Sequence, residues 1–158
     1  PTRRSSDHVA AGTSKVSFII TAVSVVALAR ILLWRVQGRI ENAHAADVAL
    51  LVVLIAMVTS RVLSPQYNLW IFGILAVSAL TPSKHFALKV KLFFVSAFAG
   101  QVLYPFAYVS YQEGEVFPTA VQTVRVVTLV ALTIISWREL SQIAKRPDQT
   151  QQVVSATE

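Results

Sequence analysis

The stretch VLSPQYNLWIFGILAVSALTPS, residues 62–83, contains no charged side chain, and it decides the fold class. Residues 92–112 and 116–124 also lack Asp, Glu, Lys and Arg. A helix needs about 20 mainly apolar residues to cross the hydrocarbon core of a membrane. Because the apolar runs are continuous rather than alternating, they favour helices over the strands of a β-barrel. We therefore predict an all-α, polytopic transmembrane helical bundle.

The composition agrees with this class. Hydrophobic residues make up 54% of the chain and charged residues only 14%, whereas soluble domains have about 25% charged residues. The net charge is +6, but the basic residues flank apolar runs, so membrane lipids rather than nucleic acid are the predicted partners. The absence of cysteine excludes disulfides and thiolate metal sites. The alternative is a soluble helical protein whose apolar runs are all buried.

The pattern predicts about five spans, at residues 16–34, 45–60, 67–80, 90–110 and 118–137. Pro105 is expected to kink the fourth of these spans. Tyr104, Tyr108 and Tyr111 recur at i, i+4 and i+7, so they are predicted to share one face of that helix.

The distribution of Lys and Arg in short loops predicts the orientation. If the C-terminus is cytoplasmic, most of the fourteen basic residues lie on the cytoplasmic side. The prediction is therefore N-out and C-in, in a bacterial plasma membrane. With this orientation Arg61 and the loop at 111–118 lie on the extracytoplasmic side.

The ends of the chain are expected to lie outside the bundle. Residues 1–12 are predicted to be a disordered tail, 13–140 the transmembrane region, and 141–158 a disordered cytoplasmic tail. Residues 1–7 resemble the translation of a sequencing adapter, and a trimmed native tail is the alternative. Since Met57 is the only methionine, we expect the C-terminal part of a longer protein.

Candidate binding residues gather where residues 61–70 interrupt the apolar pattern. The guanidinium of Arg61, at the lipid–water boundary, either binds a phosphate bidentately or reaches out to lipid headgroups. Pro65 lacks a backbone N–H and disfavours helix at Ser64. The backbone groups left unpaired by this break must be buried in protein or face a wet cavity.

The side chains that follow the break offer contacts to a sugar. Gln66 and Asn68 carry amides suited to sugar hydroxyls, unless this segment is only a turn between helices. Tyr67 and Trp70 either stack on a sugar or prenyl chain or belong to an interfacial aromatic belt.

Arg125 lies inside the fifth predicted span, roughly 10 Å deep at a rise of 1.5 Å per residue. An arginine at this depth costs about 2.5–3.5 kcal/mol on insertion scales. It therefore needs an anionic ligand in a cavity, an ion pair, or a path to the interface. Glu113 and Glu115 are the candidate acidic partners on the same side. No phosphate-binding loop, His/Cys cluster or Ser–His–Asp arrangement is recognisable, so no cofactor or metal is expected.

The segment Arg61-Val-Leu-Ser-Pro-Gln-Tyr-Asn-Leu-Trp70, between two apolar runs, resembles a known signature. It is similar to the basic-Val-Leu-Ser-Pro-Gln-Tyr-x-x-Trp motif of family 87 glycosyltransferases, which belong to the GT-C superfamily of polytopic membrane enzymes. A similar Ser-Gln-Tyr-x-x-Trp feature occurs in the first mannosyltransferase of the glycosylphosphatidylinositol pathway. The match covers about ten residues, and Asn68 stands where the family often has an apolar residue.

The resemblance implies transfer of a hexose, typically mannose, from a polyprenyl-phosphate sugar donor to a lipid or glycan acceptor. Transfer in that family takes place on the extracytoplasmic face. The family's catalytic aspartate lies near the N-terminus of the whole enzyme, so the resemblance implies no catalytic residue in this chain. Arg61, Ser64, Gln66 and Tyr67 would line the donor site, and Arg125 is the fifth candidate substrate-binding residue. The alternative is a non-catalytic membrane protein, either half of a lipid-linked-sugar transporter or an assembly subunit.

Overall fold

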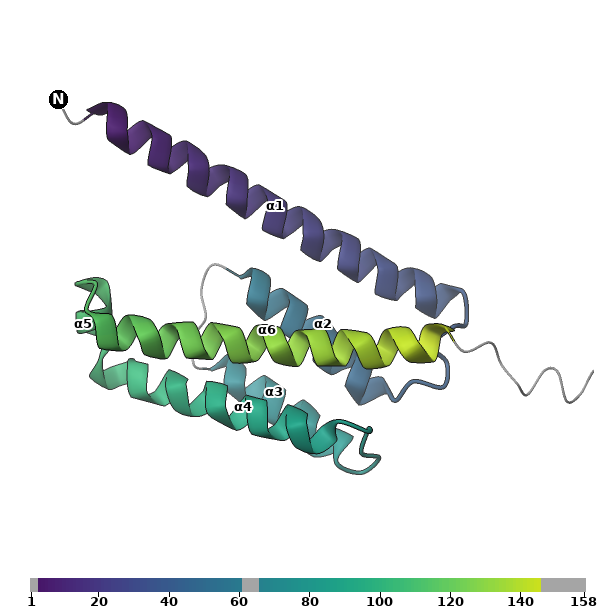
Figure 1. Cartoon of the computed structure of the whole chain (residues 1–158). Coiled ribbons are helices and arrows are strands. Elements are labelled where there is room, and N and C mark those ends of the chain that lie inside the picture. The colour runs from purple at the N-terminus through teal and green to yellow at the C-terminus, as the bar shows by residue number, and fades with distance from the viewer. Residues whose placement is uncertain (1–2, 61–65, 146–158) are drawn as a thin grey trace, which may run out of the picture.

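The computed structural model describes residues 3–60 and 66–145, and these residues form helices joined by short turns (Figure 1). In chain order the elements are α1 (Arg3–Val36), α2 (Ala45–Thr59), α3 (Tyr67–Ser78), α4 (Phe86–Gln101), η1 (Val102–Phe106), α5 (Tyr108–Gln112) and α6 (Val116–Lys145). The predicted all-α class is therefore confirmed for the described residues.

Within the described residues, three helical stretches are long and apolar enough to cross a membrane: Ser17–Val36, Phe86–Pro105 and Val116–Lys145. They indicate a membrane-embedded protein. The apolar helices α2 and α3 lie where the second and third spans were predicted, but they have only 15 and 12 residues. At 1.5 Å per residue they measure roughly 22 and 18 Å, against about 30 Å for a hydrocarbon core.

The fourth predicted span is interrupted as expected at Pro105. Helix α4 ends at Gln101, and Tyr104 has an extended backbone with φ −125° and ψ 123°. Proline removes a backbone donor and collides with the preceding turn, which explains the break. The continuous helix that a shared face of Tyr104 and Tyr111 requires is not formed, because the backbone is extended at Tyr104 and α5 begins only at Tyr108.

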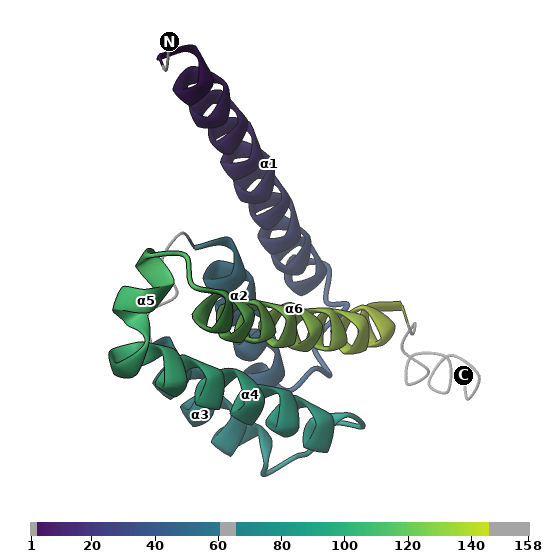
Figure 2. The same ribbon diagram turned by 60° about the vertical axis from the view of Figure 1, so that its left-hand side comes forward.

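Helix α1 is longer than predicted, since it begins at Arg3 and takes in most of the segment expected to be a tail. Figures 1 and 2 show α1 close to the other helices at its C-terminal end and diverging from them toward its N-terminus. The close end is held by Trp34, whose ring centroid lies 5.4 Å from that of Trp137. Arg39 also donates a 2.9 Å hydrogen bond from Nε to the carbonyl of Ala144.

Helix α6 also exceeds its predicted end, by continuing to Lys145. Leu140 and Ala144 in this extension are buried against the end of α1. The remainder of the predicted cytoplasmic tail, residues 146–158, lies outside the described residues.

The main core lies between α2, α3, α4 and α6. Its buried residues are Leu50, Leu54, Met57, Ile71, Leu75, Phe93, Leu129 and Leu132. On α6, Arg125, Leu129 and Leu132 follow one another at spacings of four and three residues, so all three share the inward face. The same periodicity that buries the leucines therefore also carries Arg125 into the bundle.

Candidate functional site

Arg125 is buried in the helical bundle, with only 3% of its surface exposed. It lies about nine residues, or about 13 Å, beyond the first residue of α6. The Nε and Nη2 atoms of its guanidinium have no hydrogen-bond partner. Buried polar groups are nearly always paired, and an unpaired charge is the most costly exception. Among the described residues, Arg125 is therefore the strongest candidate for part of a binding site.

Helices α3 and α4 bring two further residues to the guanidinium. A Cβ atom at Gly100 of α4 would lie 3.3 Å from Nε of Arg125 and 3.4 Å from Nδ2 of Asn68. The guanidinium and the amide therefore meet over the bare backbone of α4. Asn68, in the first turn of α3, is 9% exposed, and neither Nδ2 nor Oδ1 has a partner. We call Asn68, Gly100 and Arg125 the arginine site.

Two more unpaired polar atoms lie one helical turn from this site. Gln122 precedes Arg125 on α6, and its buried Oε1 has no partner. Ser96 precedes Gly100 on α4, is fully buried, and has an unpaired hydroxyl. The arginine site thus presents donors from Arg125 and Asn68, with acceptors from Asn68 and, one turn away, Gln122.

The acidic partners predicted for Arg125 are not used. Glu113 and Glu115 are exposed in the turn before α6, and no ion pair within residues 66–145 joins either of them to Arg125. An outward path to the interface is also contradicted, because the side chain is buried. The third interpretation, an anionic ligand in a cavity, stays a prediction.

The other predicted site residues lie at or before the start of α3. Gln66 is exposed, and Tyr67 is half-buried beside the main core, with its ring centroid 5.3 Å from that of Trp70 in an edge-on contact. Arg61 and Ser64 lie outside the described residues. Asn68 is thus the residue of this segment that meets Arg125.

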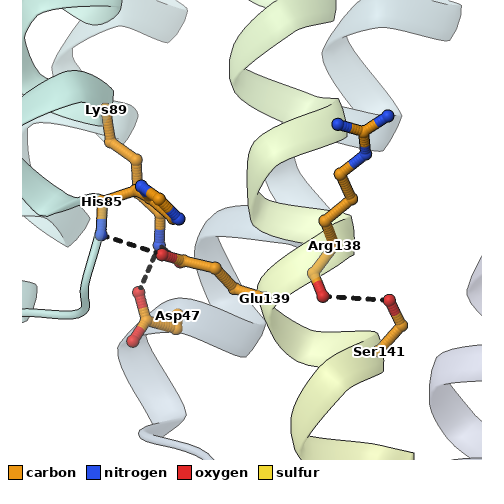
Figure 3. A network of polar contacts seen from close by, with 6 residues as sticks. All are labelled: Asp47, His85, Lys89, Arg138, Glu139 and Ser141. Atoms are coloured by element: carbon orange, nitrogen blue, oxygen red, sulfur yellow. Dashed lines mark hydrogen bonds and ion pairs between the residues drawn. The ribbon is translucent and has the colours of Figure 1, made fainter.

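A second buried cation lies at the other end of α4 (Figure 3). Lys89 is 1% exposed; its Nζ lies 3.1 Å from a carboxylate oxygen of Asp47, and it also pairs with Glu139. Glu139 Oε1 accepts a 3.0 Å hydrogen bond from the backbone N–H of His85, just before α4. This lysine triad of Lys89, Asp47 and Glu139 ties α2, α4 and α6 together.

Sequence reasoning missed the lysine triad. Lys89 was counted only with the other basic residues that indicate the orientation, and neither Asp47 nor Glu139 was linked to it. The available signal was periodicity, because Lys89, Phe93 and Ser96 fall on one buried face of α4. Among the described residues, no cluster of three or more His, Asp or Glu side chains is placed to hold a metal ion.

An apolar groove of about 610 Å³ lies between α4 and α6. Phe98 and Phe117, both largely exposed, form part of its rim. Its walls include Ala99 and Val124, the chain neighbours of Gly100 and Arg125. The groove therefore runs along α4 and α6, two of the three helices that build the arginine site.

No protein family, curated protein or solved structure matches this chain.

Proposed function

We propose that the chain is the C-terminal membrane portion of a GT-C glycosyltransferase. The enzyme would transfer a hexose, mannose by the resemblance, from a polyprenyl-phosphate donor to a lipid or glycan acceptor. The observation that carries the proposal is the buried guanidinium of Arg125, with two nitrogens unpaired, facing the unpaired amide of Asn68. The resemblance of residues 61–70 to the family 87 motif supports it independently.

A phosphate would supply hydrogen-bond acceptors for the unpaired nitrogens of Arg125. Hydrogen bonds from a guanidinium to a phosphate are charge-assisted and often bidentate. When a sugar leaves a polyprenyl phosphate, negative charge develops on the phosphate oxygens. A fixed cation in a water-poor site stabilises that developing charge. Arg125 is thus suited both to bind the donor and to assist its departure.

The mixture of donors and acceptors favours a sugar-bearing anion. A simple phosphate diester offers only acceptors, which would leave Oδ1 of Asn68 and Oε1 of Gln122 unpaired. Sugar hydroxyls donate as well as accept, so a glycosyl phosphate matches both sets. The apolar groove between α4 and α6 is suited to hold part of a prenyl chain.

The proposal includes about five spans with N-out and C-in topology, in a bacterial plasma membrane. With that topology Arg125 lies in the extracytoplasmic half of the bundle, where the resembled family works. The two acidic residues nearest in sequence, Glu113 and Glu115, do not pair with Arg125 in the described structure. By the resemblance, the catalytic aspartate would come from the N-terminal part of the whole enzyme.

The lack of an acid at the arginine site also supports the second candidate, a non-catalytic carrier or assembly subunit for lipid-linked sugars. Both candidates would bind the same ligand. They differ in transfer: a longer protein containing this chain should release polyprenyl phosphate from the donor if it is an enzyme, and should leave the donor intact if it is a carrier.

Binding to the purified chain in nanodiscs tests the arginine site. The probes are farnesyl phosphate and a farnesyl-phosphate mannose, and the variants are Arg125→Gln and, as a matched control, Arg138→Gln at the exposed far end of α6. Loss of charge-assisted bonds is worth about 1.5–3 kcal/mol, or roughly 10- to 150-fold in affinity. We expect that loss for Arg125→Gln alone, with tighter binding of the mannosylated probe. Equal affinity of Arg125→Gln and the unaltered chain would refute the proposal.

A further inference from the structure

We propose that Gly100 is a positioning residue of the arginine site, because its bare backbone sets where the guanidinium of Arg125 and the amide of Asn68 lie. This inference rests on the proposed function, since the position of these groups matters only if they bind a ligand. It concerns α4, which carries none of the residues singled out from the sequence as binding candidates.

Gly100 occupies a position where α4 otherwise presents side chains to the core. Lys89, Phe93 and Ser96 are buried along one face of α4 at spacings of four and three residues, and Gly100 follows four residues later on the same face. At Gly100 the corresponding space is taken by Arg125 and Asn68, which reach it from α6 and α3. The missing side chain is therefore replaced by polar groups from two other helices.

The contacts at this point leave little room. A Cβ atom there would lie 3.3 Å from Nε and 3.5 Å from Cζ of Arg125, and 3.4 Å from Nδ2 of Asn68. A methyl group would push the guanidinium outward by a fraction of an ångström, and a larger side chain would displace it altogether. Hydrogen bonds weaken steeply with distance and angle, so such shifts reduce binding.

Helix stability gives no reason for glycine at this position. In a helix interior glycine is less favourable than alanine, because it loses more backbone freedom on folding. Gly73 of α3 provides the contrast, because a Cβ atom there would have no neighbour within 4 Å. Substitutions at Gly73 thus carry the same change in helix propensity without touching the arginine site.

The test compares Gly100→Ala and Gly100→Leu with Gly73→Ala and Gly73→Leu, using farnesyl-phosphate mannose and the chain in nanodiscs. We expect about threefold to tenfold weaker binding for Gly100→Ala and loss of measurable binding for Gly100→Leu. Both Gly73 variants should bind within about twofold of the unaltered chain. Thermal unfolding of each variant is recorded in parallel, and Gly100→Ala decides the question if Gly100→Leu fails to fold.

A double-mutant cycle with Arg125→Lys separates positioning from general packing. Lysine keeps the charge but has no planar guanidinium to lie over Gly100. In the Arg125→Lys background, Gly100→Ala should therefore weaken binding by less than about twofold. Suppose that Arg125→Gln loses binding as expected. The inference would then be overturned if Gly100→Ala had the same effect in both backgrounds, or if Gly100→Ala alone left binding unchanged. Unchanged binding by Arg125→Gln would instead show that the proposed function fails.

Discussion

Two buried basic side chains in one bundle have opposite surroundings. Lys89 is paired with two carboxylates, whereas Nε and Nη2 of Arg125 face unpaired polar atoms. Because an unpaired buried charge is costly, this difference supports the proposal that Lys89 is structural and that a ligand pairs with Arg125. The amide of Asn68 is interpreted in the same way, because neither Nδ2 nor Oδ1 has a hydrogen-bond partner.

Replacing Asn68 by leucine should separate stability from binding. The substitution removes two buried polar atoms without partners, so the thermal midpoint should hold or rise. Affinity for farnesyl-phosphate mannose should fall about fivefold to tenfold, the worth of one or two neutral hydrogen bonds. Gln142→Leu, at an exposed position near the end of α6, is the control and should change neither quantity. A fall in stability without a loss of affinity would contradict a ligand role for Asn68.

The sequence identified some members of the arginine site but not their arrangement. Arg125 was found because a lone charge interrupts a long uncharged run, and Asn68 because its amide follows the break at Pro65 within residues 61–70. Gly100 was missed because its importance comes from residues on two other helices, which no periodicity along α4 reveals. Glu113 and Glu115 were candidate partners because they are near in sequence and on the same side, but neither pairs with Arg125 in the described structure.

At the scale of single elements, α4 and α6 position both polar clusters. Lys89 and Gly100 share the inward face of α4, as Glu139 and Arg125 do on α6. The lysine triad joins these helices at one end, and the arginine site lies where they meet Asn68. The triad therefore helps to fix the register in which Gly100 faces Arg125.

Replacing Lys89 by methionine should destabilise the bundle strongly. The change leaves Asp47 and Glu139 largely buried without their cation, which typically costs about 3–5 kcal/mol. Lys91→Met is a matched control on the exposed face of the same helix, and it should cost less than about 0.5 kcal/mol. Thermal or denaturant unfolding in detergent micelles measures both. Similar stabilities of the two variants would show that the triad contributes little.

For the whole molecule, hydropathy predicted the helices well and the ends of the helices less well. Long uncharged runs predicted the positions of α2, α3, α4 and α6, because burial in lipid and burial in protein select the same residues. The extension of α6 to Lys145 was missed because it depends on packing against the end of α1, including the bond from Arg39 to Ala144. Contacts of this kind leave no local pattern in the sequence.

The predicted orientation can be tested directly because the chain contains no cysteine. Single cysteines at the exposed positions Glu113 and Lys84 mark the two ends of the bundle. In intact bacterial cells a membrane-impermeant maleimide should label the Glu113→Cys variant. It should label the Lys84→Cys variant only after the membrane is permeabilised. The reverse pattern would show that the topology is inverted and would place the arginine site in the cytoplasmic half.

The depth of Arg125 along α6 also has an electrical consequence. An anion that reaches it from the Val116 end travels about 13 Å of a hydrocarbon core about 30 Å thick. One charge crossing the whole membrane gains or loses about 2.3 kcal/mol per 100 mV, so this partial path is worth about 1 kcal/mol. An inside-negative potential opposes the inward movement of an anion. A respiring cell would therefore hold its lipid-linked ligand several-fold less tightly than a de-energised one, which valinomycin-treated proteoliposomes can measure.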